Sequence, residues 1–373
     1  MTNTQTSLET QVPFFRPDLT ENEVEEVTTA LKSGWLTSGP RVRRFELEFA
    51  DAVRASRALA VNSGTAALHL LMLAHGLREG DEVITSPFSF VASANAALFV
   101  GARPVFVDIE EETYCLDASR VEAAITPRTR AIMPVDLYGH PAPIDALRDI
   151  ASRRGVLLIE DACQAHGAMV GARKAGALGV DATFSFYPTK NMTTAEGGMV
   201  TTADARLAET VAMLRQHGAT ERYQHKMLGY NFRMTDIAAA IGRAQLRKLD
   251  GWNEARRRNA SLLDEGLASV PGVRTPKERP GHRHAYHQYT VLVEGDRDRF
   301  QSRLRELGVG SAVHYAVPVH RQPLYATLGY GEVSMPVAER VAEHVLSLPV
   351  HPALSESDLD RIVEAVRQVA TSR

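Results

Sequence analysis

The chain has only two cysteines among its 373 residues, Cys115 and Cys163, and they are not spaced as a pair. A disulfide framework is therefore not expected, and the composition fits a reducing compartment such as the cytoplasm. The histidines His282, His284 and His287 lie close together in the sequence, but no cysteine or acidic residue is spaced with them. Because a metal site needs converging ligands, we favour a solvated or dimer-contact loop here and predict no metal.

An excess of charge of one sign is also lacking, as are long hydrophobic runs. The chain carries 42 Lys+Arg against 45 Asp+Glu, a formal net charge of −3, which favours neither nucleic acid nor an anionic membrane surface as a partner. Its most apolar stretch, residues 88–107, contains Asn95, Arg103 and Pro104 and is interpreted as a helix and a strand, not a membrane span. Residues 1–12 lack the basic start and apolar segment of a signal peptide. We expect a cytoplasmic protein.

The chain does have length and a regular alternation of strand and helix patterns. Short apolar segments separated by helical patterns predict an α/β fold with a mostly parallel sheet covered on both faces. Before this region, Thr20 and Glu23 form a capping box for a first helix, and Pro40 opens a second. The predicted strands are Ala58–Val61, Glu82–Thr85, Pro104–Asp108, Ala131–Val135, Val156–Glu160, Thr183–Phe186 and Met199–Thr202. The predicted helices are Gly64–His75, Val91–Val100, Ala118–Ile125 and Ile144–Arg154.

The pattern changes after about residue 249 and predicts a smaller α+β unit. Three consecutive arginines, residues 256–258, are interpreted as an exposed helix face. We therefore predict a large α/β domain over residues 1–250 and a small C-terminal domain over residues 251–373, with the N-terminal segment a candidate to pack against the small one. The predicted elements are Trp252–Leu267, Arg297–Leu307, Pro336–Leu346 and Ser355–Ala370 as helices, and His287–Val293 and Ser311–His314 as strands.

A turn of small residues, Ser63, Gly64 and Thr65, lies between a predicted strand and a predicted helix. Free backbone N–H groups at the start of a helix bind anions, and Gly64 allows a close approach of the backbone. Taken alone, an ordinary N-cap turn is the commoner explanation of such a sequence.

Asp161 follows an apolar run and lies at the carboxyl end of a predicted central strand, where ligands of open α/β sheets bind. It could keep a pyridine nitrogen protonated, or it could simply cap the next turn. Lys190 leaves a strand through Tyr187 and a proline, and most such lysines are exposed. The predicted cofactor is pyridoxal phosphate, which has a phosphate, a ring nitrogen and an aldehyde. The turn at Ser63–Thr65, which we call the anion turn, and the hydroxyl of Ser185 match the phosphate. Asp161 matches the ring nitrogen, and Lys190 matches the aldehyde.

Several motifs resemble the sugar aminotransferases of the DegT/DnrJ/EryC1/StrS group, within the fold type I pyridoxal-phosphate enzymes. The resemblance extends over nearly the whole chain and is specific for the family rather than for a substrate. The motifs are residues 33–40 (SGWLTSGP), 62–68 (NSGTAAL), 88–92 (FSFVA), 160–167 (EDACQAHG), 184–191 (FSFYPTKN), 196–200 (EGGMV), 229–235 (GYNFRMT) and 313–320 (VHYAVPVH).

The resemblance implies a role for each of several residues. Lys190 would bind the cofactor covalently and then move protons, and Asp161 would pair with the ring nitrogen. Gln164 would lie on the ring hydroxyl side, and Phe90 would stack on the ring, although core packing explains that phenylalanine equally well. The phosphate would be held by Ser63, Gly64, Thr65 and Ser185. Asn231 would reach it from a neighbouring subunit, so a homodimer with shared active sites is expected.

The resemblance also implies substrate contacts for Trp35, Thr37, Tyr187 and His320. The implied reaction moves an amino group from glutamate or glutamine to a keto-sugar, most often nucleotide-linked. A keto-cyclitol of an antibiotic pathway, an aromatic precursor and a non-catalytic regulatory relative remain as alternatives.

Three positions bear on these alternatives. A dehydratase branch of the family has histidine in place of the lysine, so Lys190 argues against that branch. Ala195 and Asp136 stand where many relatives have glycine and histidine, which weakens any transfer of substrate identity.

Overall fold

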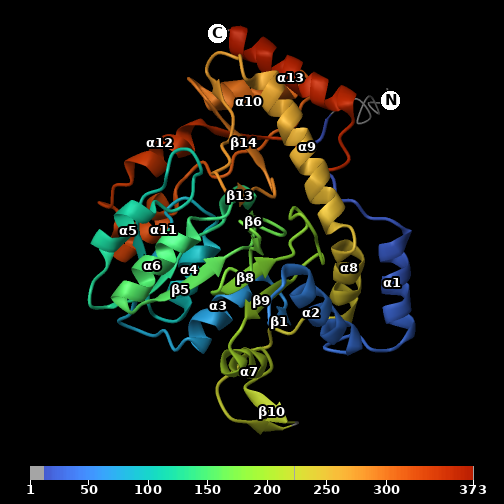
Figure 1. The fold of residues 1–373 in the computed structure, drawn as a ribbon, viewed down its shortest axis with the longest axis vertical. Coiled ribbons are helices and arrows are strands. Elements are labelled where there is room, and N and C mark those ends of the chain that lie inside the picture. The colour runs from blue at the N-terminus through green and yellow to red at the C-terminus, as the bar shows by residue number, and fades with distance from the viewer. Residues whose placement is uncertain (1–11, 222, 373) are drawn as a thin grey trace, which may run out of the picture.

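The structure is a computed structural model that describes residues 12–221 and 223–372. Its centre is a seven-stranded sheet with the strand order β1-β9-β8-β5-β4-β2-β3 (Figure 1). Neighbouring strands run parallel except at β9, which is antiparallel to both β1 and β8. The strands are β1 (Arg57–Val61), β2 (Glu82–Thr85), β3 (Arg103–Phe106), β4 (Thr129–Met133), β5 (Leu157–Asp161), β8 (Asp181–Ser185) and β9 (Gly198–Thr202).

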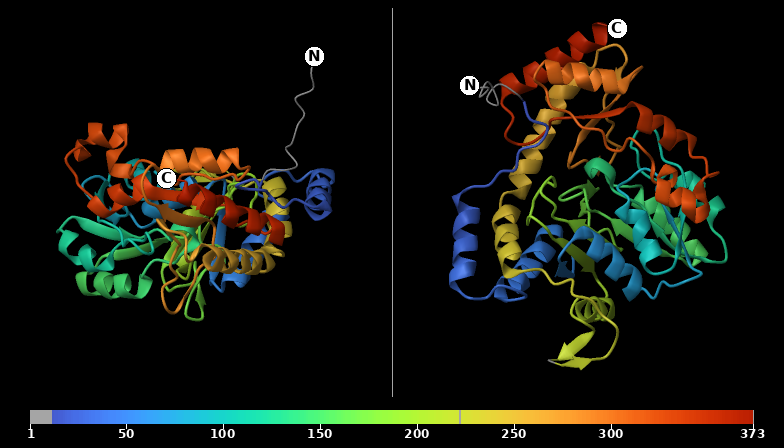
Figure 2. Two further views of the ribbon diagram at one scale, coloured as in Figure 1. Left: turned by 90° about the horizontal axis from the view of Figure 1, so that it is seen from above. Right: turned by 180° about the vertical axis from the view of Figure 1, so that it is seen from behind.

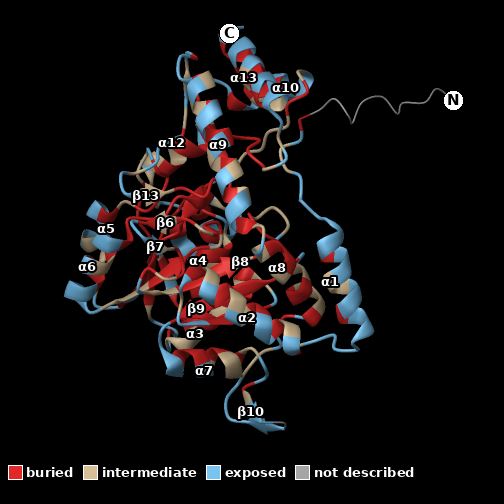
Figure 3. Ribbon diagram, turned by 45° about the vertical axis from the view of Figure 1, so that its right-hand side comes forward, coloured by how far each residue is buried: buried red, intermediate tan, exposed pale blue. Residues whose placement is uncertain are grey.

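Helices cover both faces of this sheet, which confirms the predicted α/β class. Successive residues of β1 show why: Leu59 and Val61 pack with the cluster of α3, α4 and α7, whereas Ala58 and Ala60 pack on the opposite side with α2 and α8. Figure 3 shows the resulting buried centre. The helices are α2 (Pro40–Val53), α3 (Gly64–Ala74), α4 (Ala92–Phe99), α5 (Ala118–Ala124), α6 (Ile144–Arg154), α7 (Ala205–Leu214) and α8 (Asp236–Leu246).

The C-terminal part of the chain builds a second core around a three-stranded sheet with the order β12-β14-β15. Helix α9 connects the two parts, and Figure 2 shows it running from α8 to the C-terminal helices. The N-terminal segment joins this part, because Val12 hydrogen-bonds the backbone of Gly308 and Gly310. The elements are α9 (Leu249–Leu267), β12 (Val273–Arg274), β14 (Tyr289–Val293), α10 (Arg297–Glu306), α11 (Pro323–Tyr325), α12 (Pro336–His344), β15 (Val345–Leu348) and α13 (Glu356–Thr371).

Several short elements complete the fold. A second three-stranded sheet joins β13 (His282–Arg283), β6 (Met169–Val170) and β7 (Arg173–Lys174), and a hairpin of β10 (Ala219–Glu221) and β11 (Gln224–His225) projects beyond α7 (Figure 1). No helix in the described ranges is both long and apolar enough to span a membrane. The division of the chain into domains at residue 250 stays a prediction.

Two predictions for the C-terminal part were wrong. The helix predicted to reach Leu346 ends at His344, and the chain continues as strand β15. The first residues of β15 are apolar, and a short apolar run is compatible with either a helix or a strand. The strand predicted at Ser311–His314 is reduced to a single bridge between Ala312 and Ser347.

The interpretation of residues 256–258 as an exposed face was also wrong. Arg258 is exposed, but Arg257 is half-buried and Arg256 is only 4% exposed. The reason is the helical period of α9, which places Arg256 on the same face as the buried Asn253 and Asn259.

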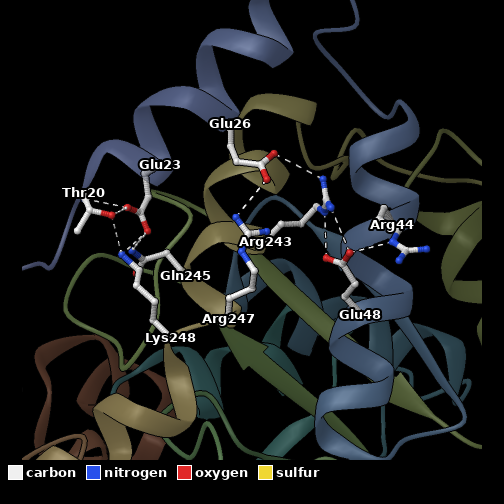
Figure 4. Close-up of polar contacts among 9 residues, drawn as sticks. All are labelled: Thr20, Glu23, Glu26, Arg44, Glu48, Arg243, Gln245, Arg247 and Lys248. Atoms are coloured by element: carbon white, nitrogen blue, oxygen red, sulfur yellow. Dashed lines mark hydrogen bonds and ion pairs between the residues drawn. The ribbon is translucent and has the colours of Figure 1, made fainter.

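Helix α1 (Glu21–Lys32) docks on α8 through polar contacts (Figure 4). Glu23 is almost fully buried and caps its own helix through Thr20. Its carboxylate also contacts Lys248 Nζ at 2.6 Å and Gln245 Nε2 at 2.8 Å. Burial by itself would raise the pKa of Glu23, but the hydrogen bonds from Lys248, Thr20 and Gln245 outweigh it and lower this pKa to about 2. Glu23 is therefore ionised at neutral pH and fixes α1 on α8.

We predict that Glu23→Ala lowers the free energy of unfolding by about 1–3 kcal/mol, because it removes a helix cap and leaves buried donors without an acceptor. The matched control is Glu25→Ala, which truncates an exposed glutamate of the same helix and should change stability by less than about 0.5 kcal/mol. Urea unfolding of the two variants checks this. Equal losses would show that the α1–α8 contact does not depend on Glu23.

Candidate active site

A cavity of about 460 Å³ opens at the carboxyl end of β5 and β8, a volume typical of ligand sites. The structure brings most of the sequence-predicted site residues to its wall. They are Ser63, Gly64, Thr65, Phe90, Asp161, Gln164, Ser185, Tyr187 and Lys190. These residues come from segments up to 127 positions apart (Ser63 to Lys190), and the crossovers of a parallel sheet bring them together.

The start of helix α3 forms the floor of one end of the cavity. Ser63 Oγ accepts the N–H of Ala66 at 3.0 Å and so caps the helix, which is the ordinary N-cap arrangement. Gly64 is required here by space, because a Cβ on it would lie 2.7 Å from Ser185 Cβ. The glycine therefore lets the helix N-terminus and the Ser185 hydroxyl face one point, which suits an anionic group.

Asp161 is the charged group at the end of β5 and is 2% exposed. One carboxylate oxygen, Oδ2, accepts the Ser93 hydroxyl at 2.7 Å, and the other, Oδ1, accepts the Cys163 N–H at 3.2 Å. Ser93 Oγ in turn lies 3.0 Å from Ser89 Oγ. These bonds fix the carboxylate's orientation. Ser93 was not singled out from the sequence, because it lies 68 residues from Asp161 and only the fold brings the two together.

Lys190 enters the cavity from a turn in which its N–H donates to the Tyr187 carbonyl at 2.9 Å. Burial lowers the pKa of its ammonium group, and the opposing charge of Asp161 offsets only part of this effect. A lysine whose pKa is lowered has more of the neutral amine that attacks a carbonyl.

Gln164 connects the two parts of the molecule across the cavity. Its Oε1 accepts the Tyr138 N–H at 2.9 Å, and its Nε2 donates to the Tyr315 hydroxyl at 3.3 Å. The Tyr315 ring lies 6.3 Å from that of Phe90, which is 56% exposed and therefore not a core residue. The exposed ring of Phe90 presents a free apolar face to the cavity.

Four predicted residues do not line this cavity. Asn231 is exposed on a neighbouring loop, and its carbonyl lies 3.5 Å from Asn62 Nδ2. Trp35 and Thr37 are exposed, with Thr37 bridged to Thr235. His320 is fully buried, with Nε2 at 2.8 Å from Glu339 Oε1. This placement does not support a substrate contact for His320, and the roles of all four residues stay predictions.

The cavity also includes residues to which the sequence assigned no part in the site. One of them, His287, belongs to the loop interpreted above as solvated or a dimer contact; His287 is 6% exposed and His284 is 3% exposed, so the interpretation as a solvated loop was wrong for these two residues. From the C-terminal part come His287, Gln288, His314 and Tyr315, and from the sheet region come Ser89, Ser93, Cys163, Thr189 and Glu196. His314 and Tyr315 lie in one of the recognised motifs, which was the one signal available for them. Within residues 12–221 and 223–372, no three histidine, cysteine, aspartate or glutamate side chains are grouped so that they could hold a metal ion.

Ala195 and Asp136, which depart from the family pattern, both lie at unusual positions in the structure. Ala195 adopts φ = +68°, in the left-handed region that favours glycine, at a cost of about 1 kcal/mol. Asp136 is 1% exposed and lies behind the cavity, where its side chain hydrogen-bonds the fully buried Glu160. Apart from this shared bond, Asp136 Oδ2 and Glu160 Oε1 have no hydrogen-bond partner among the residues that the structure describes.

The surroundings of the Asp136–Glu160 pair favour a bound proton up to about neutral pH. Burial raises the pKa of both carboxyl groups. The charge of Glu160 raises the pKa of Asp136 further, and the charge of Asp161 raises that of Glu160. A proton shared between Asp136 Oδ2 and Glu160 Oε1 gives both orphaned oxygens a hydrogen bond. The pair then adds one negative charge, rather than two, next to Asp161.

Comparison with known proteins matches this chain over nearly its whole length. The model of the DegT/DnrJ/EryC1/StrS aminotransferase family matches residues 17–367. The dTDP-3-amino-3,4,6-trideoxy-alpha-D-glucose transaminase of Streptomyces venezuelae is 42% identical over 96% of both chains. The X-ray structure of DesV from S. venezuelae in complex with a ketimine intermediate superposes with a TM-score of 0.94 at 42% identity, over 96% of this chain and 98% of that one. A putative sugar aminotransferase from Streptococcus pneumoniae in its PMP form gives a TM-score of 0.93 at 30% identity, over 97% and 98%.

The shared proton predicts a pH dependence of stability. The folded pKa values of Asp136 and Glu160 are raised, so the pair stabilises the fold fully below the ordinary carboxyl range and loses this contribution as the pH rises through about 7. The free energy of unfolding should fall by up to about 1.4 kcal/mol per pH unit between the ordinary carboxyl range and a pH of about 7. In Asp136→Asn, an amide N–H replaces the shared proton and the slope should disappear.

Urea unfolding from pH 5 to 9 of the wild type and Asp136→Asn provides the measurement. Other titrating groups act equally on both proteins, so the difference in the free energy of unfolding isolates the pair. A difference that does not change with pH would show that the two carboxyl groups do not share a proton.

Proposed function

The chain belongs to the DegT/DnrJ/EryC1/StrS aminotransferase family, and we propose that it moves an amino group from glutamate or glutamine to a nucleotide-linked keto-sugar with pyridoxal phosphate as cofactor. In the complete reaction the donor's amino group and the acceptor's carbonyl oxygen change places. The observation that carries the proposal is the meeting of Lys190 and Asp161 in one cavity with the N-terminus of α3. A binding protein has no need of a desolvated lysine at such a place.

The residues present fit the cofactor. The N–H groups that begin α3, the hydroxyls of Thr65 and Ser185 and the space left by Gly64 suit its phosphate. The buried carboxylate of Asp161 suits the protonated ring nitrogen, and Phe90 offers a flat apolar face. When bound, pyridoxal phosphate supplies an aldehyde that takes up the amino group and a ring that withdraws electrons from it.

The chain's own residues would then orient the reactants and move the proton. Ser93 and the Cys163 N–H hold Asp161 in one orientation, so its charge stays directed at the ring position. Gln164 is fixed by its hydrogen bonds with Tyr138 and Tyr315, and it would contact the edge of the cofactor ring that carries the hydroxyl group. Burial lowers the pKa of Lys190, and we assign its Nζ the removal and return of the proton at the donor's carbon atom.

A nucleotide-linked acceptor is supported by the S. venezuelae transaminase and by two exposed aromatic rings, one of which lies in the cavity wall. Tyr187 lines the cavity mouth and is 49% exposed, and Trp35 is 57% exposed. Such rings are suited to stacking with a base or a sugar. A keto-cyclitol, which lacks a nucleotide, would use the cavity without these outer rings. Comparing both acceptors with glutamate as donor separates the two substrate classes.

A homodimer with shared sites would explain the position of Asn231. This residue is exposed beside Asn62, one residue before the anion turn, rather than inside the cavity of its own chain. Exposed apolar side chains of Trp35, Leu36 and Leu228 lie on adjoining segments, as expected for a surface that a second copy covers. We therefore assign Asn231 to the phosphate site of the partner subunit.

We predict that Lys190→Ala abolishes amino transfer, with a loss of at least about 10³-fold, because the covalent anchor and the proton carrier are removed together. The wild type should be yellow and bleach on reaction with glutamate, whereas the variant should not. Lys226→Ala, on an exposed loop, is the control and should leave turnover unchanged. Near-normal turnover in Lys190→Ala would contradict the assignment, and a colourless wild type would favour the regulatory alternative.

The shared site is tested by mixing two inactive chains, one carrying Lys190→Ala and the other Asn231→Ala. In a mixed dimer one site carries both changes and the other carries neither, so part of the wild-type activity should return. Native mass spectrometry of the same sample establishes that the mixed dimer forms. If it forms and remains as inactive as its parents, each site is built from a single chain.

A further inference from the structure

A second, smaller cavity adjoins the candidate active site. Its volume is about 30 Å³, enough for about two water molecules or one small charged group. Thr189, His287, Gln288 and His314 line both cavities, so the two share a wall. The far side of the small cavity is formed in part by Arg256 of helix α9.

Arg256 is a buried cation that forms no ion pair with any residue in the described part of the chain. It is 4% exposed, and its Nη1 donates only to backbone carbonyls, those of Tyr286 at 3.1 Å and His287 at 3.3 Å. Its Nε is buried and has no hydrogen-bond partner in the described part of the chain. Burial lowers the pKa of Arg256 to about 10, so the guanidinium remains charged at neutral pH.

Another buried arginine, Arg297, has the carboxylate partner that a buried cation usually has. Arg297 is 9% exposed, but its Nε lies 2.5 Å from a carboxylate oxygen of Asp298. No carboxylate forms an ion pair with Arg256 within residues 12–221 and 223–372. A buried charge that lacks a counter-charge is costly, and a bound anion would remove that cost.

The remaining polar groups of the small cavity are neutral and can donate hydrogen bonds. His287 is buried with a free Nδ1, and burial lowers its pKa, with the positive charges of Lys190 and Arg256 adding to the effect. His287 therefore lies within the electrostatic range of both cations. Gln288 accepts from Ser347 through Oε1 at 3.4 Å, which leaves its amide N–H groups free to donate. One fixed positive charge with neutral donors around it is a site for a monovalent anion.

We propose that the Arg256 cavity binds a carboxylate group of the amino-acid donor. The donor's amino group would be at Lys190, and its carboxylate would reach the guanidinium where the two cavities share Thr189 and His287. The donor class is then an amino acid whose carboxylate is recognised by charge, whereas the keto-sugar ring of the acceptor carries no carboxylate. This inference rests on the proposed function, and it separates the donor and acceptor contacts within one active site.

The test replaces Arg256 by methionine, which keeps the length but not the charge, and by lysine, which keeps the charge. Arg257→Met is the matched control, because Arg257 is the next residue of α9 and pairs instead with Glu278 at 2.5 Å. In the donor half-reaction, KM for glutamate should rise about 10- to 100-fold in Arg256→Met and less in Arg256→Lys. KM for the keto-sugar, measured in the separate acceptor half-reaction, should not change, whereas a merely structural role would affect both.

A binding measurement without turnover complements the kinetics. Glutarate carries the carboxylates of glutamate but no amino group, and glutaramide carries neither charge. Glutarate should raise the melting temperature of the wild-type protein and of Arg257→Met, but not that of Arg256→Met, and glutaramide should have no effect on any of them. If Arg256→Met does not fold, competition of glutarate with glutamate in the wild type and in Arg256→Lys still decides the matter.

Alanine as donor identifies which carboxylate is bound. An equal loss for alanine and glutamate in Arg256→Met assigns the α-carboxylate, and a loss confined to glutamate assigns the side-chain carboxylate. An unchanged KM for both amino acids, with unchanged glutarate binding, would overturn the proposal. Should no amino acid react with the wild-type enzyme at all, it is the proposed function that fails instead.

Discussion

The orientation of one buried carboxylate, that of Asp161, is the constraint on which the rest of the site depends. It lies at the end of a central strand, where the Ser93 hydroxyl and the Cys163 N–H bind one oxygen each. A buried carboxylate needs hydrogen-bond donors in place of water, and both of these partners are donors. Lys190, the N-terminus of α3 and the C-terminal segment with Tyr315 are then arranged around this fixed negative charge.

The same charge explains features that lie outside the cavity wall. Asp136 and Glu160 lie directly behind Asp161, and three ionised carboxylates would repel each other in this buried region. A proton shared by the pair reduces this repulsion. On the other side of the cavity Arg256 adds an uncompensated positive charge. The site therefore has a negative end, where a cationic ring fits, and a positive end, where an anionic donor fits.

The sequence predicted the sheet well because its signals are local. Runs such as Ala58–Val61 are apolar and are followed by turn residues. Thr20 with Glu23 forms a capping box that involves four consecutive positions. The cavity residues with distinctive chemistry, Lys190 and Asp161, were likewise visible in local motifs. What could not be predicted depends on contacts between distant segments. Ser93 acquires its role only through Asp161, and Arg256 is buried because α9 packs on the loop before β14.

The central claim is that Lys190 is the residue through which this cavity binds the cofactor. The most direct measurement is to incubate the purified protein with pyridoxal phosphate, reduce it with borohydride and locate the modified residue by peptide mass mapping. The account predicts one pyridoxyl group per chain, on the peptide that contains Lys190, and its loss when glutamate is added before the reduction. Modification of another lysine, or none at all, would contradict it.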